Sequence, residues 1–201
     1  MVSGKAFRIS GVWCGKGGRQ VEPAQRPDEI FDVVDERDRV IGQSSRREVH
    51  EKGLFHRAVH VLILNHSNKI FLQKRSMAKD VHPGCWDSSA SGHLDKGEDY
   101  LPAIEREIQE ELGVQAPRNL RFLFKLEPSR DNGWEFVKVY TGLHSGPFKL
   151  NPAEISEGQW WTSEEVAQSI RSSPGIWASS FLEVWRNWLC LADPENDLLN
   201  D

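Results

Sequence analysis

The sequence contains little cysteine, and this scarcity limits the classes of protein to which it can belong. Only three cysteines occur in 201 residues, and they lie far apart, at Cys14, Cys85 and Cys190. An odd number without the short spacing of zinc ligands argues against a disulfide framework and against a thiolate metal site. A reducing compartment is the default for such a chain, so we expect a cytoplasmic protein.

An excess of basic charge and a long apolar run are also missing. Lysine and arginine number 25 against 30 aspartates and glutamates, which gives a formal net charge of −5. Without a basic stripe to neutralise phosphates, we expect no nucleic acid partner. No apolar run approaches the roughly 20 residues that span a bilayer, and no apolar signal-peptide core lies near the start. We therefore expect neither a membrane partner nor a secretory signal.

Composition divides the chain into three parts. Residues 1–27 hold glycine and basic residues but almost no acid, and they show neither a helical nor a strand period. They are predicted to form a flexible extension. Residues 28–192 are long enough for one domain with a normal core. Residues 193–201, "DPENDLLND", are predicted to form a short acidic tail.

Strand and helix patterns are interleaved within residues 28–192, which predicts an α/β fold. A small hairpin is predicted at 29–43, where apolar stretches flank the turn-like "ERD". The other strand-like segments are 57–65, 69–75, 85–94, 120–126 and 134–142. The predicted helices are at about 99–112, 162–171 and 178–191. Together these segments predict a mixed sheet with helices packed on it.

The first predicted helix carries an unusual concentration of negative charge. At roughly 100° per residue, Glu107, Glu110 and Glu111 fall within an arc of about 100°, beside the apolar arc that packs on the sheet. Adjacent carboxylates destabilise a helix unless a cation lies between them. Oxygen ligands without histidine or cysteine on that face favour Mg²⁺ or Mn²⁺. The alternative is a solvated acidic face on which Arg106 pairs with Glu110.

The spacing of residues 92–114 decides between these interpretations. The segment resembles the Nudix box: glycine, five residues, glutamate, seven residues, Arg-Glu, an aliphatic, any residue, Glu-Glu, any residue, glycine, an aliphatic. The matching residues are Gly92, Glu98, Arg106, Glu107, Ile108, Glu110, Glu111, Gly113 and Val114. Seven fixed identities give a chance match of about 10⁻⁸ per starting point at ordinary residue frequencies. The resemblance to Nudix hydrolases extends from about Glu29 to Leu191.

The resemblance implies a fold, an activity and a cofactor. The implied fold is the Nudix fold, an α/β/α sandwich around a mixed sheet, here with a small N-terminal β-hairpin. The implied activity is hydrolysis of a small-molecule diphosphate, such as a nucleoside diphosphate derivative, with Mg²⁺ or Mn²⁺ as the cofactor. The implied metal ligands are Glu107, Glu111, Glu110 and, through its carbonyl, Gly92. The implied catalytic residues are Glu110 as a further ligand or base, and Arg106, which orients Glu98 and its neighbours.

More of the chain resembles one branch, the isopentenyl-diphosphate isomerase-like Nudix proteins. The resemblance continues through "RREVHEKGLFHRAVH" and "KRSMAKDVHPGCWDSSASGH". It implies that the substrate diphosphate is bound by Arg46, Arg75 and Lys79. The residues that resemble ligands of the isomerases' divalent metal, and so form a candidate second metal site, are His50, His56, His93 and Glu135. Glu135 is also a candidate general base.

Two departures from the isomerase pattern favour hydrolysis. The isomerases carry an essential cysteine just before the box glycine, whereas this chain has Ser91, whose high pKa makes it a poor substitute for a thiol. The isomerases commonly lose glutamates from the box, and here all are kept. Two alternatives stay open: an isopentenyl-diphosphate isomerase, and a non-catalytic module that senses a diphosphate ligand. A homodimer stays open beside a monomer.

The sequence does not identify the group that the diphosphate carries. Specificity is expected in the loops 127–134 and 143–152. Trp86, Trp134 and Trp160 are candidates to stack on a base, with the core as the alternative. The remaining histidines are interpreted as structural residues: His60, His66, His82 and His144.

Overall fold

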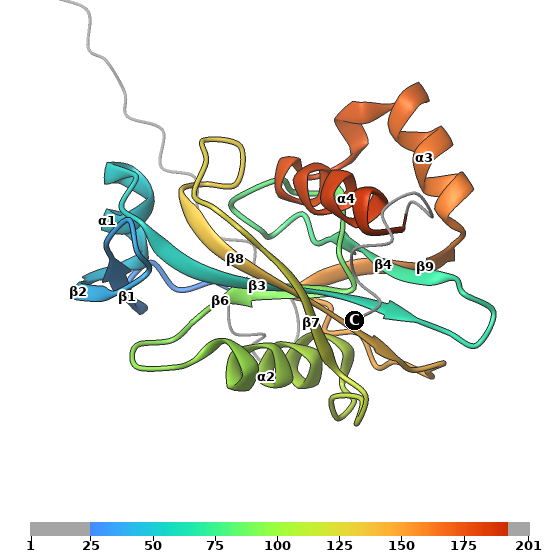
Figure 1. Ribbon diagram of the computed structural model, residues 1–201, viewed down its shortest axis with the longest axis horizontal. Helices are drawn as coiled ribbons and strands as arrows, with labels where there is room; N and C mark the ends of the chain where they lie inside the picture. The colour runs from blue at the N-terminus through green and yellow to red at the C-terminus, as the bar shows by residue number, and fades with distance from the viewer. Residues whose placement is uncertain (1–24, 193–201) are drawn as a thin grey trace, which may run out of the picture.

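The structure is a computed structural model that describes residues 25–192 (Figure 1). The predicted acidic tail at 193–201 lies outside the described residues, and so does the predicted extension, except for residues 25–27. Within the described part of the chain, no helix is long and apolar enough to cross a membrane.

The N-terminal hairpin forms a small sheet of its own. Strand β1 (Ile30–Val34) pairs antiparallel with β2 (Val40–Ser45), as the sequence predicted. The connecting turn contains Asp38 in the left-handed conformation (φ 58°), which aspartate tolerates better than most residues. The Asp38 side chain is bonded to Arg57 and Lys125, so the turn is tied to the main domain.

A short helix that the sequence did not predict follows the hairpin. Helix α1 (Arg46–Lys52) begins after Ser45, whose hydroxyl accepts from the Glu48 amide, and ends at Gly53 in the left-handed conformation (φ 61°). Seven residues are too few to show a helical period, so these caps mark the helix better than its apolar pattern does.

The main sheet has seven strands. They are β3 (His56–Leu64), β4 (Ile70–Arg75), β5 (Trp86–Asp87), β6 (Ala90–His93), β7 (Arg121–Leu126), β8 (Glu135–Leu143) and β9 (Ile155–Trp161). Their order is β5-β4-β3-β8-β7, with β6 also paired to β3 and β9 to β4. Strands β3 and β8 are parallel and the other pairs are antiparallel, so the sheet is mixed, as predicted.

Helices cover both faces of this sheet (Figure 1). They are α2 (Tyr100–Leu112), α3 (Ser163–Ser172) and α4 (Ser179–Ala192), with a 3₁₀ turn η1 (Pro174–Ile176) before α4. Successive side chains of β3 point to opposite faces. Val59 and Val61 therefore join the core under α2, whereas Ala58 and Leu62 join the core under α4. The architecture is the predicted α/β/α sandwich.

Helix α2 has the ends that its sequence indicates. The Asp99 side chain accepts a hydrogen bond from the Tyr100 amide, and Gly113 terminates the helix in the left-handed conformation (φ 67°). Pro102 lies in the first turn, where a missing N–H breaks no helical hydrogen bond.

The sequence also did not predict strand β9. Much of the strand is exposed, and Gly158 interrupts its apolar pattern. A side chain at Gly158 would overlap the ring of Phe71 on the neighbouring strand, so the glycine permits close packing there. Pairing with β4 makes this segment a strand, and tertiary pairing of this kind is not encoded in local periodicity.

Candidate active site

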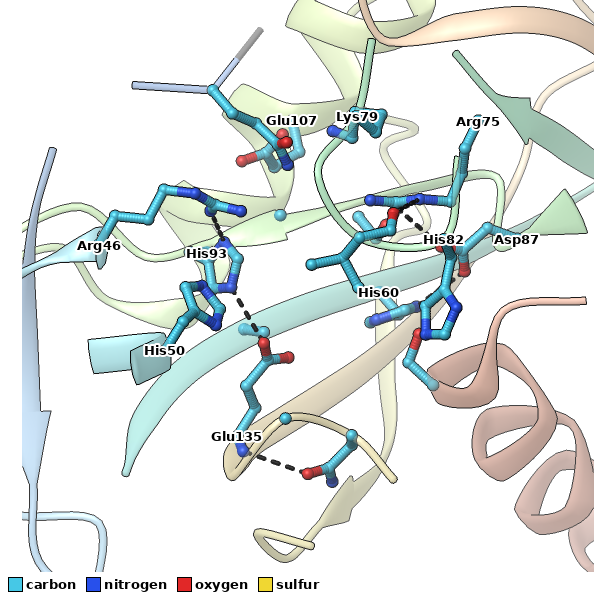
Figure 2. A pocket seen from close by; sticks show the side chains of 18 of the residues that line it. Arg46, His50, His60, Arg75, Lys79, His82, Asp87, His93, Glu107 and Glu135 are labelled. Atoms are coloured by element: carbon cyan, nitrogen blue, oxygen red, sulfur yellow. Dashed lines mark hydrogen bonds and ion pairs between the residues drawn. The ribbon is translucent and has the colours of Figure 1, made fainter. Parts of the chain in front are cut away.

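A cavity of ≈ 390 Å³ brings together residues from the hairpin, α1, the main sheet, α2 and the start of α4 (Figure 2). The sequence-predicted residues that line it are Arg46, His50, Arg75, Lys79, Gly92, His93, Arg106, Glu107, Glu110 and Glu135. Glu98, Glu111 and His56 lie behind this lining. Each of the three contacts a residue of the lining: Glu98 contacts Arg106, Glu111 contacts Ser91, and His56 contacts Glu135.

Three of the four glutamates of α2 belong to the box, and they differ in their surroundings. Glu107 and Glu111 are buried, with 8% and 2% of their surface exposed, whereas Glu110 is exposed at the rim of the cavity. The amide of Ser91 and the side-chain amide of Gln73 donate to Glu111 Oε2, at 3.1 and 2.8 Å. These two donors fix the carboxylate of Glu111 against the end of β6.

Gly92 allows the close approach of β6 and α2. A Cβ at this position would overlap the Glu107 carboxylate. The glycine of the box is therefore required by packing, because any side chain would displace a buried carboxylate. Its carbonyl as a metal contact stays a prediction.

Arg106 connects the predicted catalytic groups to one another. Its Nε and Nη2 bind the two oxygens of Glu98 at 3.0 and 2.8 Å, a bidentate pair with defined geometry. Its Nη1 donates to Glu107 at 2.7 Å and to Glu110 at 3.3 Å, and Nη2 also donates to the His93 carbonyl at 3.0 Å. This arrangement matches an orienting role, because Arg106 holds Glu107 in place from the side of Glu98.

Burial raises the pKa of the two inner carboxylates. The pKa of Glu107 is raised to about 7 and that of Glu111 to about 8, mainly because burial disfavours the charged forms, while Arg106 and Lys79 act in the opposite direction. A divalent cation would offset both the burial and the mutual repulsion. The donors are oxygens alone, which fits Mg²⁺ or Mn²⁺.

The candidate second metal site forms a compact cluster, which we call the histidine cluster (His50, His56 and His93). One ring nitrogen from each of the three lies within 4.8 Å of the others. Nε2 of His50 and Nε2 of His56 are buried and have no hydrogen-bond partner among the described residues. Buried polar atoms without partners are rare, and a bound cation would provide one. The donor set therefore fits a metal.

Glu135 lies against the histidine cluster. Its Oε1 is 3.0 Å from His93 Nε2 and 3.4 Å from His56 Nε2. Burial alone would raise the pKa of Glu135, but the His93 and His56 rings lower it well below its ordinary value. Burial lowers the pKa of His93 to about 3. The structure thus holds a carboxylate beside the neutral imidazole of His93, which is a common metal-ligand combination.

The three basic residues predicted to bind the diphosphate all line the cavity, and each one is paired with a carboxylate. Arg46 donates from Nη2 to both oxygens of Asp80 at 3.0 and 2.9 Å, Arg75 binds Asp87 at 3.0 Å, and Lys79 binds Glu154. Arg46 also contacts His93 Nδ1 at 3.0 Å. Their cationic groups are pre-positioned by these carboxylates, so they are less mobile than isolated surface cations.

Sequence reasoning missed several residues of this site: Gln73, Asp87, Glu154, His60 and His82. A signal for His60 exists, because His56, Ala58 and His60 alternate along β3 and therefore share a face. No local signal marks Glu154, which reaches the cavity because β9 pairs with β4.

The predicted specificity loops and tryptophans contribute unequally. Residues 130–133 of the loop 127–134 line the cavity, whereas the loop 143–152 supplies no lining residue. Trp86 and Trp160 pack in the two cores, and Trp134 stacks on Phe55. None of these three tryptophans lines the cavity.

Comparisons with known proteins identify the family of the chain. The family model described as NUDIX domain matches residues 54–178. An uncharacterized Nudix hydrolase of Yersinia pestis is 38% identical over 141 residues, 69% of this chain and 75% of that protein. An isopentenyl-diphosphate Delta-isomerase of Serratia proteamaculans is 30% identical over 163 residues, 80% of this chain and 91% of that protein. The crystal structure of DR0079 from Deinococcus radiodurans has a TM-score of 0.70 and 28% identity, and the match covers 79% of this chain and 98% of that one.

These matches include hydrolases and isomerases, as expected for the isomerase-like branch of the family. The family model covers most of the domain, including the box that supplies Glu107 and Glu111. The chain is therefore an enzyme that belongs to the Nudix hydrolase family.

Proposed function

We propose that this enzyme is a divalent-metal-dependent hydrolase that cleaves the diphosphate linkage of a small molecule, such as a nucleoside diphosphate derivative. The observation that carries the proposal is the pair of buried carboxylates, Glu107 and Glu111, at a cavity that also presents basic side chains. In the reaction, water adds across the P–O–P bond, one bridging P–O bond breaks, and two phosphate products leave.

Glu107, Glu111 and the exposed Glu110 are the residues that would hold the cation, with the Gly92 carbonyl beside them. A Mg²⁺ or Mn²⁺ ion bound there supplies neutralisation of the diphosphate charge and activation of water. Arg106 keeps Glu107 and Glu98 oriented through its network of hydrogen bonds. Preorganisation of this kind lowers the barrier because no group has to reorient during the reaction.

Arg46, Arg75 and Lys79 would bind the diphosphate from the other side. Guanidinium groups match phosphate oxygens in a bidentate manner, and an ammonium acts as a point charge. Since each cation already has a carboxylate partner, a bound diphosphate would share or replace that partner. Glu135 and Glu110 are the candidates for the general base.

The histidine cluster supports a second proposal, a divalent metal bound by His50, His56, His93 and Glu135. This cluster also favours the second candidate function, the isomerase, because four of the five ligand positions match the isomerase pattern, whereas the fifth, a glutamate in the isomerases, is Gly133. Ser91 opposes that candidate, since its hydroxyl stands where the isomerases use a thiol. Incubation with isopentenyl diphosphate, followed by detection of dimethylallyl diphosphate, would distinguish the two functions.

A single substitution tests the hydrolase. Glu111→Gln keeps the size of a buried side chain but removes its charge, so we expect kcat to fall by about 10³-fold on any diphosphate that is cleaved with Mg²⁺ or Mn²⁺. The matched control is Glu105→Gln, an exposed glutamate of the same helix that does not line the cavity. A variant of Glu111 with full metal-dependent activity, or a wild-type protein that binds but cleaves no diphosphate in a broad panel, would refute the proposal.

A further inference from the structure

One side of the cavity consists of hydrogen-bonding side chains that the proposed chemistry does not use. We call it the polar wall, and its residues are His60, His82, Asp87, Ser179 and Ser180. Figure 2 shows His60, His82 and Asp87 on the right of the cavity, with His50, His93 and Arg46 on the left. The wall is assembled from β3, the segment before β5, β5 itself and the start of α4.

His60 is the central residue of the polar wall. It is 4% exposed, and burial lowers its pKa, so the ring is neutral. Its Nδ1 is 2.8 Å from the Ser88 hydroxyl, whereas its Nε2 makes no hydrogen bond to any described residue and is not among the fully enclosed atoms. The Nε2 atom of a buried side chain is therefore available to the cavity as a donor or an acceptor, according to the tautomer.

His82 also lines the cavity and lies in the segment that connects β4 to β5. The Ser179 hydroxyl donates its proton to the Asp131 carbonyl at 2.6 Å, so it accepts from His82 Nε2 at 3.0 Å. Nδ1 of His82 has no partner among the described residues, so it is available to the cavity. Asp87 differs, because its two oxygens are occupied by Arg75 and by the Ser88 amide.

An apolar group would be poorly matched to this wall. The apolar side chains that line the cavity are few: Phe31, Ala58 and Val81. An isoprenyl chain placed against His60 and His82 would exclude water from their ring nitrogens without replacing its hydrogen bonds. A hydroxyl group is both a donor and an acceptor, so it satisfies His60 Nε2 in either tautomer.

We propose that the polar wall binds hydroxyl groups of the organic part of the substrate, which is a small polyhydroxylated group such as a sugar, and that His60 is a specificity-determining residue. The inference rests on the proposed cleavage of a diphosphate. The volume of ≈ 390 Å³ supports it, because this is near the lower end of the roughly 300–1,000 Å³ of ligand pockets. A diphosphate and one sugar-sized group would occupy such a space.

Two diphosphates with five carbons each provide the test. Ribose 5-diphosphate carries hydroxyl groups, isopentenyl diphosphate carries none, and hydrolysis of either compound releases inorganic phosphate that one assay can measure. With the wild-type enzyme and Mg²⁺ or Mn²⁺, we expect kcat/KM to be at least about 100-fold higher for ribose 5-diphosphate. Equal values, or a preference for isopentenyl diphosphate, would overturn the inference while the hydrolase assignment would stand.

Variants then assign the preference to His60. His60→Leu should reduce the ratio below about 10 by slowing hydrolysis of ribose 5-diphosphate alone, and His60→Asn, which keeps a donor and an acceptor, should restore part of it. The control is His66→Leu, an exposed histidine that does not line the cavity. An unchanged ratio in a folded His60→Leu enzyme would overturn the role of His60. Failure to cleave either compound, or any other diphosphate, would overturn the proposed function and the inference with it.

Discussion

The glutamates of α2 and the histidine cluster share one cavity, but the protein builds them in different ways. Glu107 and Glu111 come from a single thirteen-residue helix that is packed on the core. The histidines come from α1, β3 and β6, and Glu135 comes from β8. One site is a local feature of the chain, and the other depends on how distant segments pair.

Electrostatics differ in the same two regions. Burial raises the pKa of Glu107 and Glu111, so the carboxylates of α2 carry repulsion that no neighbouring group fully offsets. In the histidine cluster, burial lowers the pKa of His93, while the rings of His93 and His56 lower the pKa of Glu135. We therefore expect a cation to stabilise the charged form of the carboxylate site, whereas in the histidine cluster the charged form of Glu135 is already stabilised by its contacts with the His93 and His56 rings.

Gly92→Ala should disrupt the carboxylate side most strongly without changing any charge. The new methyl group would overlap Glu107, so the carboxylate must move, and we expect kcat to fall by about 10²–10³-fold. We also expect a loss of stability of about 1–3 kcal/mol from overpacking. Steady-state kinetics and thermal unfolding would measure the two effects.

Gly42→Ala is the matched control for this prediction. Gly42 lies in β2, where an added Cβ would meet no atom within 4 Å. The kinetics of the Gly42→Ala enzyme should equal those of the wild type. If Gly92→Ala kept full activity, the position of Glu107 would not matter for catalysis.

The two regions also differ in how far the sequence predicts them. Helical spacing predicted that Glu107, Glu110 and Glu111 lie together, because residues three and four apart on a helix share a face, and the resemblance to the Nudix box indicated a metal site there. The histidine cluster depends on sheet register: His56 pairs with Glu135 on the parallel strand β8, and Ala58 pairs with His93 on β6. Register of this kind has no local signal, so only the family resemblance indicated those residues.

The same reasoning explains what was missed elsewhere. Asp80 and Glu154 pair with Arg46 and Lys79 across long separations, and neither carboxylate stands out in the sequence. Strand β9 escaped prediction because Gly158 and its exposed residues conceal the period of two. The order of the strands was likewise not readable, whereas the ends of α2 were, since Asp99 and Gly113 are local signals.

His56→Gln should separate the two candidate metal sites. Its ring nitrogen Nε2 is buried, makes no hydrogen bond to a described residue and lies 3.4 Å from Glu135 Oε1, so its loss should weaken metal binding at the histidine cluster by at least about 10–100-fold. Titration of metal-free protein with Co²⁺, whose visible absorption reports nitrogen ligands, would measure this. Glu111→Gln should leave the Co²⁺ spectrum of the histidine cluster unchanged but abolish turnover. Identical titrations of wild type and His56→Gln would eliminate the second site.

The smallest effect that we expect concerns the attachment of the hairpin, whose Phe31 ring stacks on His56 and His93. Asp38 binds Arg57, Lys125 and Tyr100 and so ties the β1–β2 turn to the main domain. Burial alone would raise the pKa of Asp38, but hydrogen bonds from these partners lower it below its ordinary 3.8. A lowered folded pKa means that Asp38 stabilises the protein above pH ~4 and that this stabilisation is lost as the pH falls further.

Asp38→Asn should therefore cost about 1–2 kcal/mol at pH 7, and the difference from wild type should be smaller at pH ~3. Urea unfolding at both pH values would measure it, with Asp28→Asn as the control, because Asp28 is exposed and its side chain has no hydrogen-bond or ion-pair partner among the described residues. Hydrogen exchange should become faster in β1, β2 and α1 than in α2, since α2 keeps its core contacts. Equal acceleration in α2 would show that the carboxylates and the histidine cluster are held by one cooperative unit, which would remove the structural distinction between them.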